Sequence, residues 1–306
     1  MSNITASMVK DLRDKTGAGM MDCKAALGET NGDMEAAIDW LRKKGLSKAA
    51  KKAGRVAAEG LIGVVSDNNV GALVEVNAET DFVARNDEFK AFVKDAADAA
   101  LKAEGDIEKV LAHPASEGSM KDRLTALVAK IGENMSVRRA VMLAVTEGVV
   151  ASYVHNAASP ELGKIGVLVA IKSSGDKDKL AALGKQIAMH VAAAAPLALT
   201  PEHLSKEIVD REKAIQADIA RQSGKPENVI EKMMEGRMRK FYEESVLLSQ
   251  TFVIDGETQI SKVLEKASKD LGAPVAIDAY VRFQVGEGIE KVESDFADEV
   301  SKMAGN

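Results

Sequence analysis

The stretch GALVEV, Gly71–Val76, returns later in the chain as GVLVAI, Gly166–Ile171, and this repetition decides the fold. Each copy is a short, mostly apolar run, which is typical of a strand. Before the first copy, EGLIGVVSD and a turn at 67–69 complete a hairpin. With a gap of four residues in the second copy, the helical pattern that follows also repeats and aligns Phe89 with Leu180. We therefore expect two related halves, each an antiparallel sheet backed by helices, in the α+β class.

The composition is that of a globular protein with few aromatic residues. The chain has 306 residues, of which 46% are hydrophobic and only 4% aromatic. This length allows two or three domains, and the shortage of aromatic residues favours a helix-rich core of aliphatic side chains. The formal net charge of −6 argues against extensive nucleic-acid wrapping and otherwise indicates only solubility.

The single cysteine and the N-terminus indicate where the protein works. Cys23 has no second cysteine to pair with, so an intrachain disulfide is excluded and a reducing cytoplasm is favoured. The N-terminus MSNITASMVK has no basic start followed by an apolar stretch. No window approaches the roughly 18 apolar residues of a membrane span. We therefore expect a cytoplasmic protein that is neither exported nor inserted into a membrane.

Three short helices are predicted in the first fifty-odd residues. Thr5 suits an N-cap, a stripe through Leu12 marks the first helix, and Asp33 suits the N-cap of the third. A unit this small has little core, so part of its apolar surface can be left for a partner. Met20 and Met21, placed in the region between the first two helices, are candidates for core packing and for partner contact alike.

Segment 42–55 is strongly basic. It carries seven basic residues and no acidic one: Arg42, Lys43, Lys44, Lys48, Lys51, Lys52 and Arg55. A nucleic-acid surface is one interpretation. The run has no interleaved aromatic residues, however, and the alanines and glycines around it are typical of a solvated linker helix. The linker interpretation is therefore preferred, with RNA binding as the alternative.

The four-residue gap in the repeat falls where ETDFVARN, residues 79–86, lies in the first copy. The first half therefore has a longer connection between strand and helix, and such loops often carry function. Two interpretations of Phe82 are open from the residues alone. Phe82 either folds back onto the following helix beside Phe89 and Phe92, or stays exposed beside Asp81 as an interface anchor.

A helical hairpin is predicted at 200–242. Thr200 suits a cap, Pro201 the first helical position, and isoleucines and a leucine repeat until SGKP at 223–226 ends the helix. The seam residues expected on the two helices are Leu204, Ile208, Ile215, Ile219, Ile230, Met233, Met234, Met238 and Phe241. We expect a short antiparallel coiled coil that protrudes from the core. It would contact another protein or a second copy, or serve as structural decoration.

The C-terminal region is predicted to be a strand at Tyr280–Val285 followed by a helix. The apolar face of this helix would carry Val292, Phe296, Val300 and Met303.

Several kinds of chemistry have no motif in the sequence. There is no GxxxxGK[ST] phosphate loop, no dinucleotide fingerprint and no GxSxG nucleophile motif. The four histidines lie far apart without metal-ligand spacing: His113, His155, His190 and His203. We therefore expect a protein that acts by binding rather than as an enzyme, without a metal or cofactor of its own.

A set of longer motifs resembles one family. TASMVKDLRDKTGAGMMDCKAAL, VEVNAETDFVARNDEF, VAKIGENMSVRR, IAMHVAA, RQSGKP, EGRMRKF and VRFQVGEGIEK occur in this order across nearly the whole chain. Together they resemble the bacterial translation elongation factor Ts family. The resemblance implies a ubiquitin-associated-like three-helix domain at 1–55 and a core in two halves, 56–147 and 148–280. The second half would include the hairpin 200–242, and a C-terminal helical module would follow at 281–306.

The resemblance also implies a function and its residues. The family promotes guanine-nucleotide exchange on elongation factor Tu, in its GDP-bound and nucleotide-free states, without a cofactor. The residues that would displace Mg²⁺ from the partner are Thr80, Asp81, Phe82 and Val83. Those that would contact the partner elsewhere are Leu12, Met20, Met21, Lys24, Ile131, Gly132 and His155, with help from the C-terminal helix. The resemblance therefore favours the exposed interpretation of Phe82.

One departure from the family pattern and two alternatives accompany this expectation. The residues inserted at 159–162, SPEL, bear on where His155 meets the partner. An RNA-binding accessory protein acting through 42–55 would show salt-sensitive RNA association without a protein partner. A hydrolase using scattered carboxylates would show turnover by the isolated chain.

Overall fold

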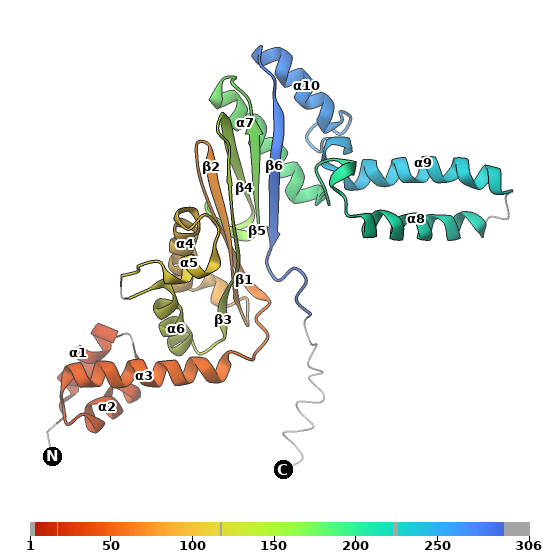
Figure 1. Ribbon diagram of the computed structural model, residues 1–306. Helices are drawn as coiled ribbons and strands as arrows, with labels where there is room; N and C mark the ends of the chain where they lie inside the picture. Colours follow the sequence, from red (N-terminus) through yellow and green to blue (C-terminus); the bar gives the residue numbers. More distant parts are fainter. Residues whose placement is uncertain (1–3, 17, 117, 223–225, 291–306) are drawn as a thin grey trace.

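A computed structural model gives the structure of residues 4–16, 18–116, 118–222 and 226–290 (Figure 1). The α-helices are α1 Ala6–Thr16, α2 Met20–Glu29, α3 Met34–Lys52, α4 Asp87–Lys102, α5 Ile107–Ala112, α6 Met120–Ile131, α7 Lys177–Ala194, α8 Lys206–Arg221, α9 Glu227–Ser245 and α10 Ile260–Leu271. Short 3-10 helices are η1 Val83–Arg85, η2 Pro201–His203 and η3 Leu247–Ser249. The strands are β1 Glu59–Asp67, β2 Val70–Ala78, β3 Met135–Ala144, β4 Gly148–Ser159, β5 Leu162–Lys172 and β6 Ala276–Gln284. The predicted α+β class is confirmed.

The strands form one antiparallel sheet rather than one sheet in each half. The order is β3-β2-β1-β5-β4, and β6 also pairs with β5. The two predicted hairpins, β1–β2 and β4–β5, are confirmed. They join through a short β1–β5 ladder in which Ile62 faces Gly163 and Gly63 faces Leu162. Further hydrogen bonds join the halves outside this ladder, among them one from the Val150 amide to the Asn68 carbonyl at 2.8 Å, and packing adds to them.

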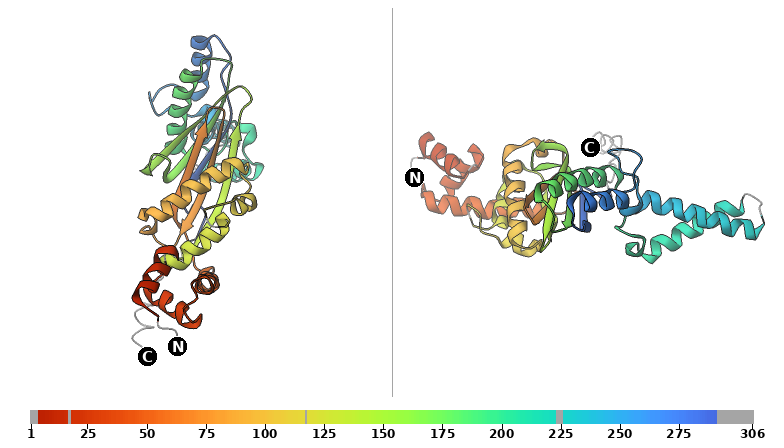
Figure 2. Two further views of the ribbon diagram at one scale, coloured as in Figure 1. Left: turned by 90° about the vertical axis from the view of Figure 1, so that its left-hand side faces the viewer. Right: turned by 90° about the horizontal axis from the view of Figure 1, so that it is seen from above.

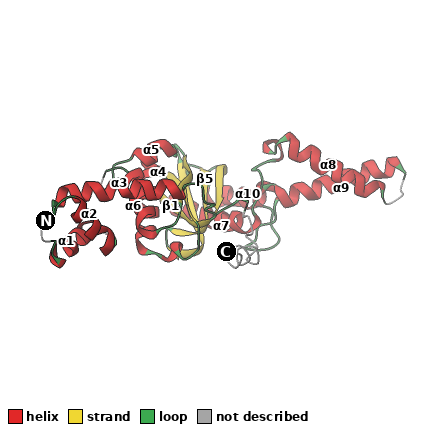
Figure 3. Ribbon diagram, turned by 90° about the horizontal axis from the view of Figure 1, so that it is seen from below, coloured by secondary structure: helices red, strands yellow, loops and turns green. Residues whose placement is uncertain are grey.

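Three apolar clusters stabilise this arrangement. One lies between β1–β3 and the helices α4, α5 and α6, a second between β4–β6 and the helices α7 and α10, and a third between the two halves of the sheet. Their large members are, in that order, Phe89 and Phe92; Leu180 and Ile187; and Ile62, Leu73, Leu168 and Phe283. The strands therefore lie at the centre with helices on both sides (Figure 3).

The two halves also share a backbone feature, a glycine with positive φ at the start of the first strand of each hairpin. Gly60 at the start of β1 has φ +131°, and Gly148 at the start of β4 has φ +137°. A Cβ on Gly60 would lie 2.1 Å from the carbonyl oxygen of Val76, and one on Gly148 would lie 1.9 Å from that of Ile171. Val76 and Ile171 are aligned residues of the sequence repeat. Both hairpins therefore begin with a glycine that the facing strand leaves no room to replace.

We expect Gly60→Ala and Gly148→Ala each to lower the free energy of unfolding by about 2 kcal/mol or more. The added Cβ meets a backbone carbonyl that is fixed in the sheet, and the backbone is in a region that only glycine adopts freely. Chemical denaturation measures the change. A matched control is Gly236→Ala within α9, where a Cβ meets no atom within 4 Å. That variant should gain about 0.5–1 kcal/mol, and an unchanged midpoint for Gly60→Ala would contradict the prediction.

The α1–α3 unit and the α8–α9 pair lie at opposite ends of the molecule, with the sheet between them (Figure 2). In the N-terminal unit the predicted caps are confirmed. Thr5 Oγ1 accepts a hydrogen bond from the Met8 amide at 3.3 Å, and Asp33 Oδ1 accepts one from the Ala36 amide at 2.9 Å.

The α8–α9 pair differs from prediction at its start. Pro201–His203 is a separate 3-10 turn rather than the first turn of the helix. Helix α8 begins at Lys206, where Ser205 Oγ accepts a hydrogen bond from the Ile208 amide at 3.3 Å. Thr200 is therefore not the cap of this helix, because a serine nearer the helix supplies the capping oxygen.

The predicted seam of α8 is wrong as well. Ile208, Ile215 and Ile219 are exposed. The stripe one residue further along, Val209, Gln216 and Ala220, has the same spacing and is more buried. Gln216 Oε1 accepts a hydrogen bond from Arg237 of α9 at 2.7 Å, which identifies this stripe as the inner one. One residue turns a helix by about 100°, so spacing alone did not indicate which stripe faces the partner helix.

The C-terminal strand is longer than predicted. It begins at Ala276 rather than Tyr280 and pairs with β5 along its length, so it belongs to the second half of the sheet and crosses the boundary expected at 280/281. The predicted helix carrying Val292, Phe296, Val300 and Met303 lies outside the described residues. Within those residues, no helix combines the length and apolar character needed to cross a bilayer.

A buried histidine stabilises the second half. His190 of α7 has no exposed surface, and its Nδ1 accepts a hydrogen bond from the Val253 amide at 3.3 Å. Gln250 uses its amide nitrogen on the Glu244 carbonyl at 2.7 Å, so its Oε1 is left to accept from His190 Nε2 at 2.9 Å. This pattern requires the neutral ring. Burial lowers the pKa of His190 and outweighs the opposing hydrogen bond from Gln250.

We expect this histidine to make the protein less stable in weak acid. The unfolded chain takes up the proton near pH 6.5, whereas the folded chain takes it up only at lower pH, so stability falls as the pH drops below about 6.5. His190→Gln lacks this contribution. Urea titrations at pH 7.5 and 5.5 should show a larger loss of unfolding free energy in the unsubstituted protein. Equal losses in the two proteins would contradict the prediction.

Candidate partner-binding site

The loop between β2 and α4 presents an exposed phenylalanine. Phe82 is 73% exposed, while Val83 and Ala84 beside it are buried in the first apolar cluster. Phe89 and Phe92 are fully buried without any contribution from Phe82 to their cluster. The interpretation that Phe82 folds back onto this helix is therefore wrong, and the structure leaves its ring at the surface.

Hydrogen bonds hold both ends of this loop. On the helix side, Asn86 Oδ1 accepts from the amides of Glu88 at 2.9 Å and Phe89 at 3.1 Å, which caps α4. On the strand side, Glu133 accepts from the Thr80 amide at 2.9 Å and from its hydroxyl at 2.7 Å. The loop is therefore held in one conformation at both ends, and Phe82 lies between these two anchored ends.

The surroundings of Phe82 are polar. The Arg85 guanidinium carbon lies 5.9 Å from the ring centroid and one guanidinium nitrogen lies 3.5 Å from the Asp81 carboxylate. Exposed pairs of this kind contribute little to stability. Full burial of a phenylalanine against a partner would release about 1.5–3 kcal/mol. The loop therefore offers an apolar group whose burial is still available for binding.

The turn after α6 lies beside this loop. Gly132 ends α6 in the left-handed conformation, and the Lys52 ammonium of α3 donates to its carbonyl oxygen. Ile131 is half-buried against the first apolar cluster. Glu133 follows directly and holds Thr80. The structure therefore brings two predicted contact segments together, Thr80–Val83 and Ile131–Gly132.

The predicted contacts in the N-terminal unit divide into exposed and buried residues. Met20 and Met21, at the start of α2 rather than in a loop, are 59% and 78% exposed, and Lys24 is exposed beside them. The core interpretation of the two methionines is therefore wrong. Leu12 has no exposed surface and packs inside the three-helix unit, so it does not offer a direct contact in this conformation.

His155 lies on β4, in the second half of the sheet. Its side chain is exposed, and Nδ1 lies 3.2 Å from the Tyr153 hydroxyl. The inserted residues 159–162 form the turn from β4 to β5. There the Glu161 carbonyl accepts from the Val64 amide at 2.9 Å and its carboxylate pairs with Lys94 at 2.8 Å. No hydrogen bond or ion pair of the described residues joins His155 to the loop at 79–86.

The basic segment is largely occupied by contacts within the chain. Arg42 pairs with Asp122 at 3.4 Å and Lys44 with Asp22 at 3.0 Å. Further along, Lys52 bonds to the Gly132 carbonyl, and Arg55 lies 3.5 Å from Glu79. The contacts of Arg42, Lys52 and Arg55 tie this segment to the first half of the core, as expected of a linker helix. The contact of Lys44 holds α3 to α2 within the N-terminal unit.

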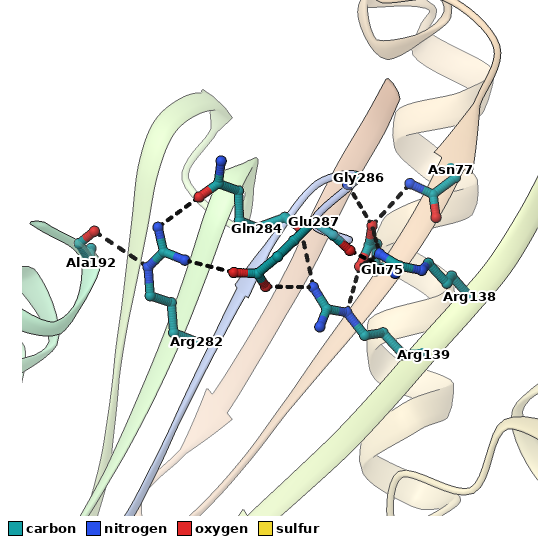
Figure 4. Close-up of polar contacts among 9 residues, drawn as sticks. All are labelled: Glu75, Asn77, Arg138, Arg139, Ala192, Arg282, Gln284, Gly286 and Glu287. Carbon is teal, nitrogen blue, oxygen red and sulfur yellow. Dashed lines mark hydrogen bonds and ion pairs between the residues drawn. The ribbon is translucent and has the colours of Figure 1, made fainter. Parts of the chain in front are cut away.

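Sequence reasoning missed a buried carboxylate, Glu75 of β2, which binds two arginines of β3 and the segment that follows β6 (Figure 4). Glu75 has no exposed surface and accepts from Arg139 Nε at 2.6 Å, Arg138 Nη1 at 3.1 Å and the Gly286 amide at 2.8 Å. Burial raises the pKa of Glu75, but hydrogen bonds from Gly286, Asn77 and Arg139 together outweigh it and hold the pKa below its usual range. The only signal in the sequence was an acidic residue within an apolar run.

The described part of the chain contains no group of three His, Cys, Asp or Glu side chains arranged to hold a metal ion. The exposed ring on an anchored loop is suited to contact with another macromolecule.

Comparisons with known proteins agree on one family. A model of the family described as "Elongation factor TS" matches residues 79–287. The chain is 60% identical over 306 residues to Elongation factor Ts of Parvibaculum lavamentivorans, which covers 99% of each chain. It is 61% identical over 304 residues to that of Rhodospirillum rubrum, covering 98% of each chain. It is 59% identical over 304 residues to that of Bartonella henselae, covering 99% of each chain.

Proposed function

Because the chain belongs to the elongation factor Ts family, we propose that it is a guanine-nucleotide exchange factor for elongation factor Tu and acts in translation elongation. The observation that carries the proposal is Phe82, which is 73% exposed on a loop anchored at both ends. The protein acts by binding and makes or breaks no covalent bond. It works in the cytoplasm and has no cofactor of its own.

In this proposal the loop weakens the grip of the partner on Mg²⁺ and phosphate. Mg²⁺ requires near-ideal octahedral geometry, so a small shift of the residues that support it weakens binding of the nucleotide. Thr80–Val83 causes that shift by inserting the Phe82 ring between partner side chains, with Asp81 beside it. Val83, which is buried, serves as the base from which the ring projects.

The coupling between the two ligands is reciprocal. If binding of this protein lowers the affinity of elongation factor Tu for its nucleotide by a certain ratio, bound nucleotide lowers the affinity of elongation factor Tu for this protein by the same ratio. Binding of a fresh nucleotide therefore releases the protein, and one molecule acts on many partners.

Other predicted residues form the wider contact. Met20, Met21 and Lys24 hold the GTPase domain from the N-terminal side, and their exposure supports this role. Ile131 and Gly132 support the contact beside the loop, and His155 meets a different domain of the partner. Leu12 acts from inside by packing beneath the three-helix surface.

Finer features of the fold belong to the same proposal. We assign α1–α3 to a ubiquitin-associated-like domain and α8–α9 to a short coiled coil. The exposed isoleucines of α8 are open to a second protein or a second copy. The domain limits 1–55, 56–147, 148–280 and 281–306 remain predictions, with β6 crossing the last of them.

Release of a fluorescent GDP from elongation factor Tu tests the function. Adding the protein in catalytic amounts should raise the release rate by at least about tenfold, which corresponds to about 1.4 kcal/mol off the barrier. A rate equal to that of spontaneous release would overturn the proposal.

The RNA-binding alternative has its own test. It requires salt-sensitive binding of RNA by the isolated chain, with affinity that falls steeply between about 50 and 200 mM salt. The internal pairing of Arg42, Lys44, Lys52 and Arg55 disfavours this outcome. We expect no such binding in a filter assay.

A further inference from the structure

Two glutamates bond reciprocally between the loop at 79–86 and the turn after α6. Glu133 accepts from the Thr80 amide at 2.9 Å and from the Thr80 hydroxyl at 2.7 Å. In the opposite direction, Glu79 accepts from the Asn134 amide at 2.5 Å. Each glutamate therefore holds the residue that follows the other. We call this four-residue arrangement, Glu79, Thr80, Glu133 and Asn134, the glutamate clasp.

The clasp lies where three segments meet. Glu79 also pairs with Arg55 at 3.5 Å, and Asn134 Nδ2 donates to the Arg55 carbonyl at 2.7 Å. Arg55 follows the end of α3, so the clasp joins the helix from the N-terminal unit to the loop and to the turn at Gly132. It fixes the relative positions of segments that are far apart in sequence.

The clasp limits the directions available to Phe82. Beyond Phe82 the loop is held by burial of Val83 and by the Asn86 cap of α4. Before it, the hydrogen bonds of Thr80 to Glu133 are the anchor. Only two residues, Asp81 and Phe82, lie between the anchors. If the hydrogen bonds of Thr80 are lost, Val83 and the Asn86 cap still hold the helix side of the loop. The Phe82 ring can then take up more orientations.

We propose that Glu79 and Glu133 are positioning residues for nucleotide exchange, and that they act through Phe82 by presenting its ring in the direction in which it enters the partner. This inference rests on the proposed function. A side chain held in its working orientation loses less conformational freedom when it is buried. The clasp should therefore affect the exchange step more than the affinity for the partner.

Kinetics of nucleotide release separate these effects. With Glu133→Ala we expect kcat for GDP release to fall about tenfold, the size expected for loss of hydrogen bonds to a charged group. KM for elongation factor Tu–GDP should change less than about twofold, because the wider contact is intact. Glu133→Gln should recover most of the rate, since its amide can still accept from the Thr80 amide and donate to the hydroxyl.

A double-mutant cycle tests whether the clasp acts through the ring. In a Phe82→Ala background, Glu133→Ala should cause no further loss of kcat. The matched control is Glu88→Ala, which removes a 2.6 Å ion pair between Lys130 of α6 and the start of α4 without touching the clasp. This variant should keep the kcat of the unsubstituted protein.

Amide hydrogen exchange gives a readout independent of the partner. In Glu133→Ala the Thr80 amide should exchange faster while the unfolding midpoint stays close to that of the unsubstituted protein. A purely structural role would instead lower the midpoint and spare kcat per folded molecule.

Three results would overturn the inference while the protein itself still accelerates GDP release. They are an unchanged kcat in Glu133→Ala, a loss confined to KM, and losses that add in the double mutant. If the unsubstituted protein fails to accelerate release, the proposed function fails first and the inference with it.

Discussion

Phe82→Ala is expected to lower kcat for GDP release about 10- to 100-fold, because burying this ring against a partner is worth about 1.5–3 kcal/mol and each 1.4 kcal/mol is a factor of ten. Binding to elongation factor Tu should largely survive, since under the proposed function Met20, Met21 and the turn at Ile131 would supply other contacts. The ring is 73% exposed in the free protein, so its removal should change the free energy of unfolding by less than about 0.5 kcal/mol.

Stopped-flow release of fluorescent GDP and a pull-down of the partner measure the two effects separately. The control is Ile254→Ala, which truncates another exposed apolar side chain, far along the chain on the loop after Phe252. It should leave kcat within about a factor of two, because scattered exposed apolar residues contribute little to a specific interface. Acceleration untouched by Phe82→Ala would keep the exchange function and move its mechanism to other contacts.

Glu75→Ala is expected to lower the free energy of unfolding by about 3 kcal/mol, because it removes a buried carboxylate that pairs with both Arg138 and Arg139. Arg138, Arg139 and the Gly286 amide would each lose a hydrogen bond to this carboxylate. The two arginines would keep their hydrogen bonds to Gln284 and Glu287. The two arginine side chains are partly exposed, at 29% each, so water replaces some of what they lose and the value stays at the lower end of the usual range.

The pH dependence of this effect has a definite sign. The folded-state pKa of Glu75 is depressed, so its contribution is complete above the unfolded pKa of about 4.3 and is lost as the pH falls through the folded value. The stability gap between the unsubstituted protein and Glu75→Gln should therefore be constant from pH 7 to about 5 and narrow below about 4.3.

Urea titrations across this range test the prediction. The control is Glu161→Ala, whose pair with Lys94 is half-exposed and should contribute little to stability, because solvent screens exposed ion pairs. A loss for Glu75→Ala no larger than that of the control would show that the buried carboxylate is not important for stability.

The sequence repeat predicted most of the core because hydrophobic burial imposes a pattern on strands and helices. The aligned Phe89 and Leu180 are both fully buried, and the gap of four residues matches the longer connection in the first half. The sequence pattern alone could not decide whether Phe82 is exposed. An aromatic residue just before a buried helix is equally compatible with packing against that helix and with exposure to solvent.

Long-range polar contacts could not be predicted either. Glu75 accepts a hydrogen bond from the Gly286 amide, 211 residues away in sequence. Glu133 accepts one from the Thr80 amide, 53 residues away. Neither pairing has a periodic signal, since each depends on where the backbone turns in three dimensions. The misplaced seam of α8 has a related cause: two stripes, one through Ile208 and one through Val209, have identical spacing.

The contact between Gly286 and Ala58 has a consequence for how the chain can be cut and rejoined. A Cβ on Gly286 would lie 2.2 Å from the Ala58 carbonyl oxygen, so the end of the sheet region returns to the place where that region starts. In the segment 58–286, the two ends of the backbone therefore lie next to each other, and a permutant can be built from this segment alone. A short linker between these two points, with new ends opened at the exposed turn 67–69, should give a circular permutant that keeps the same sheet.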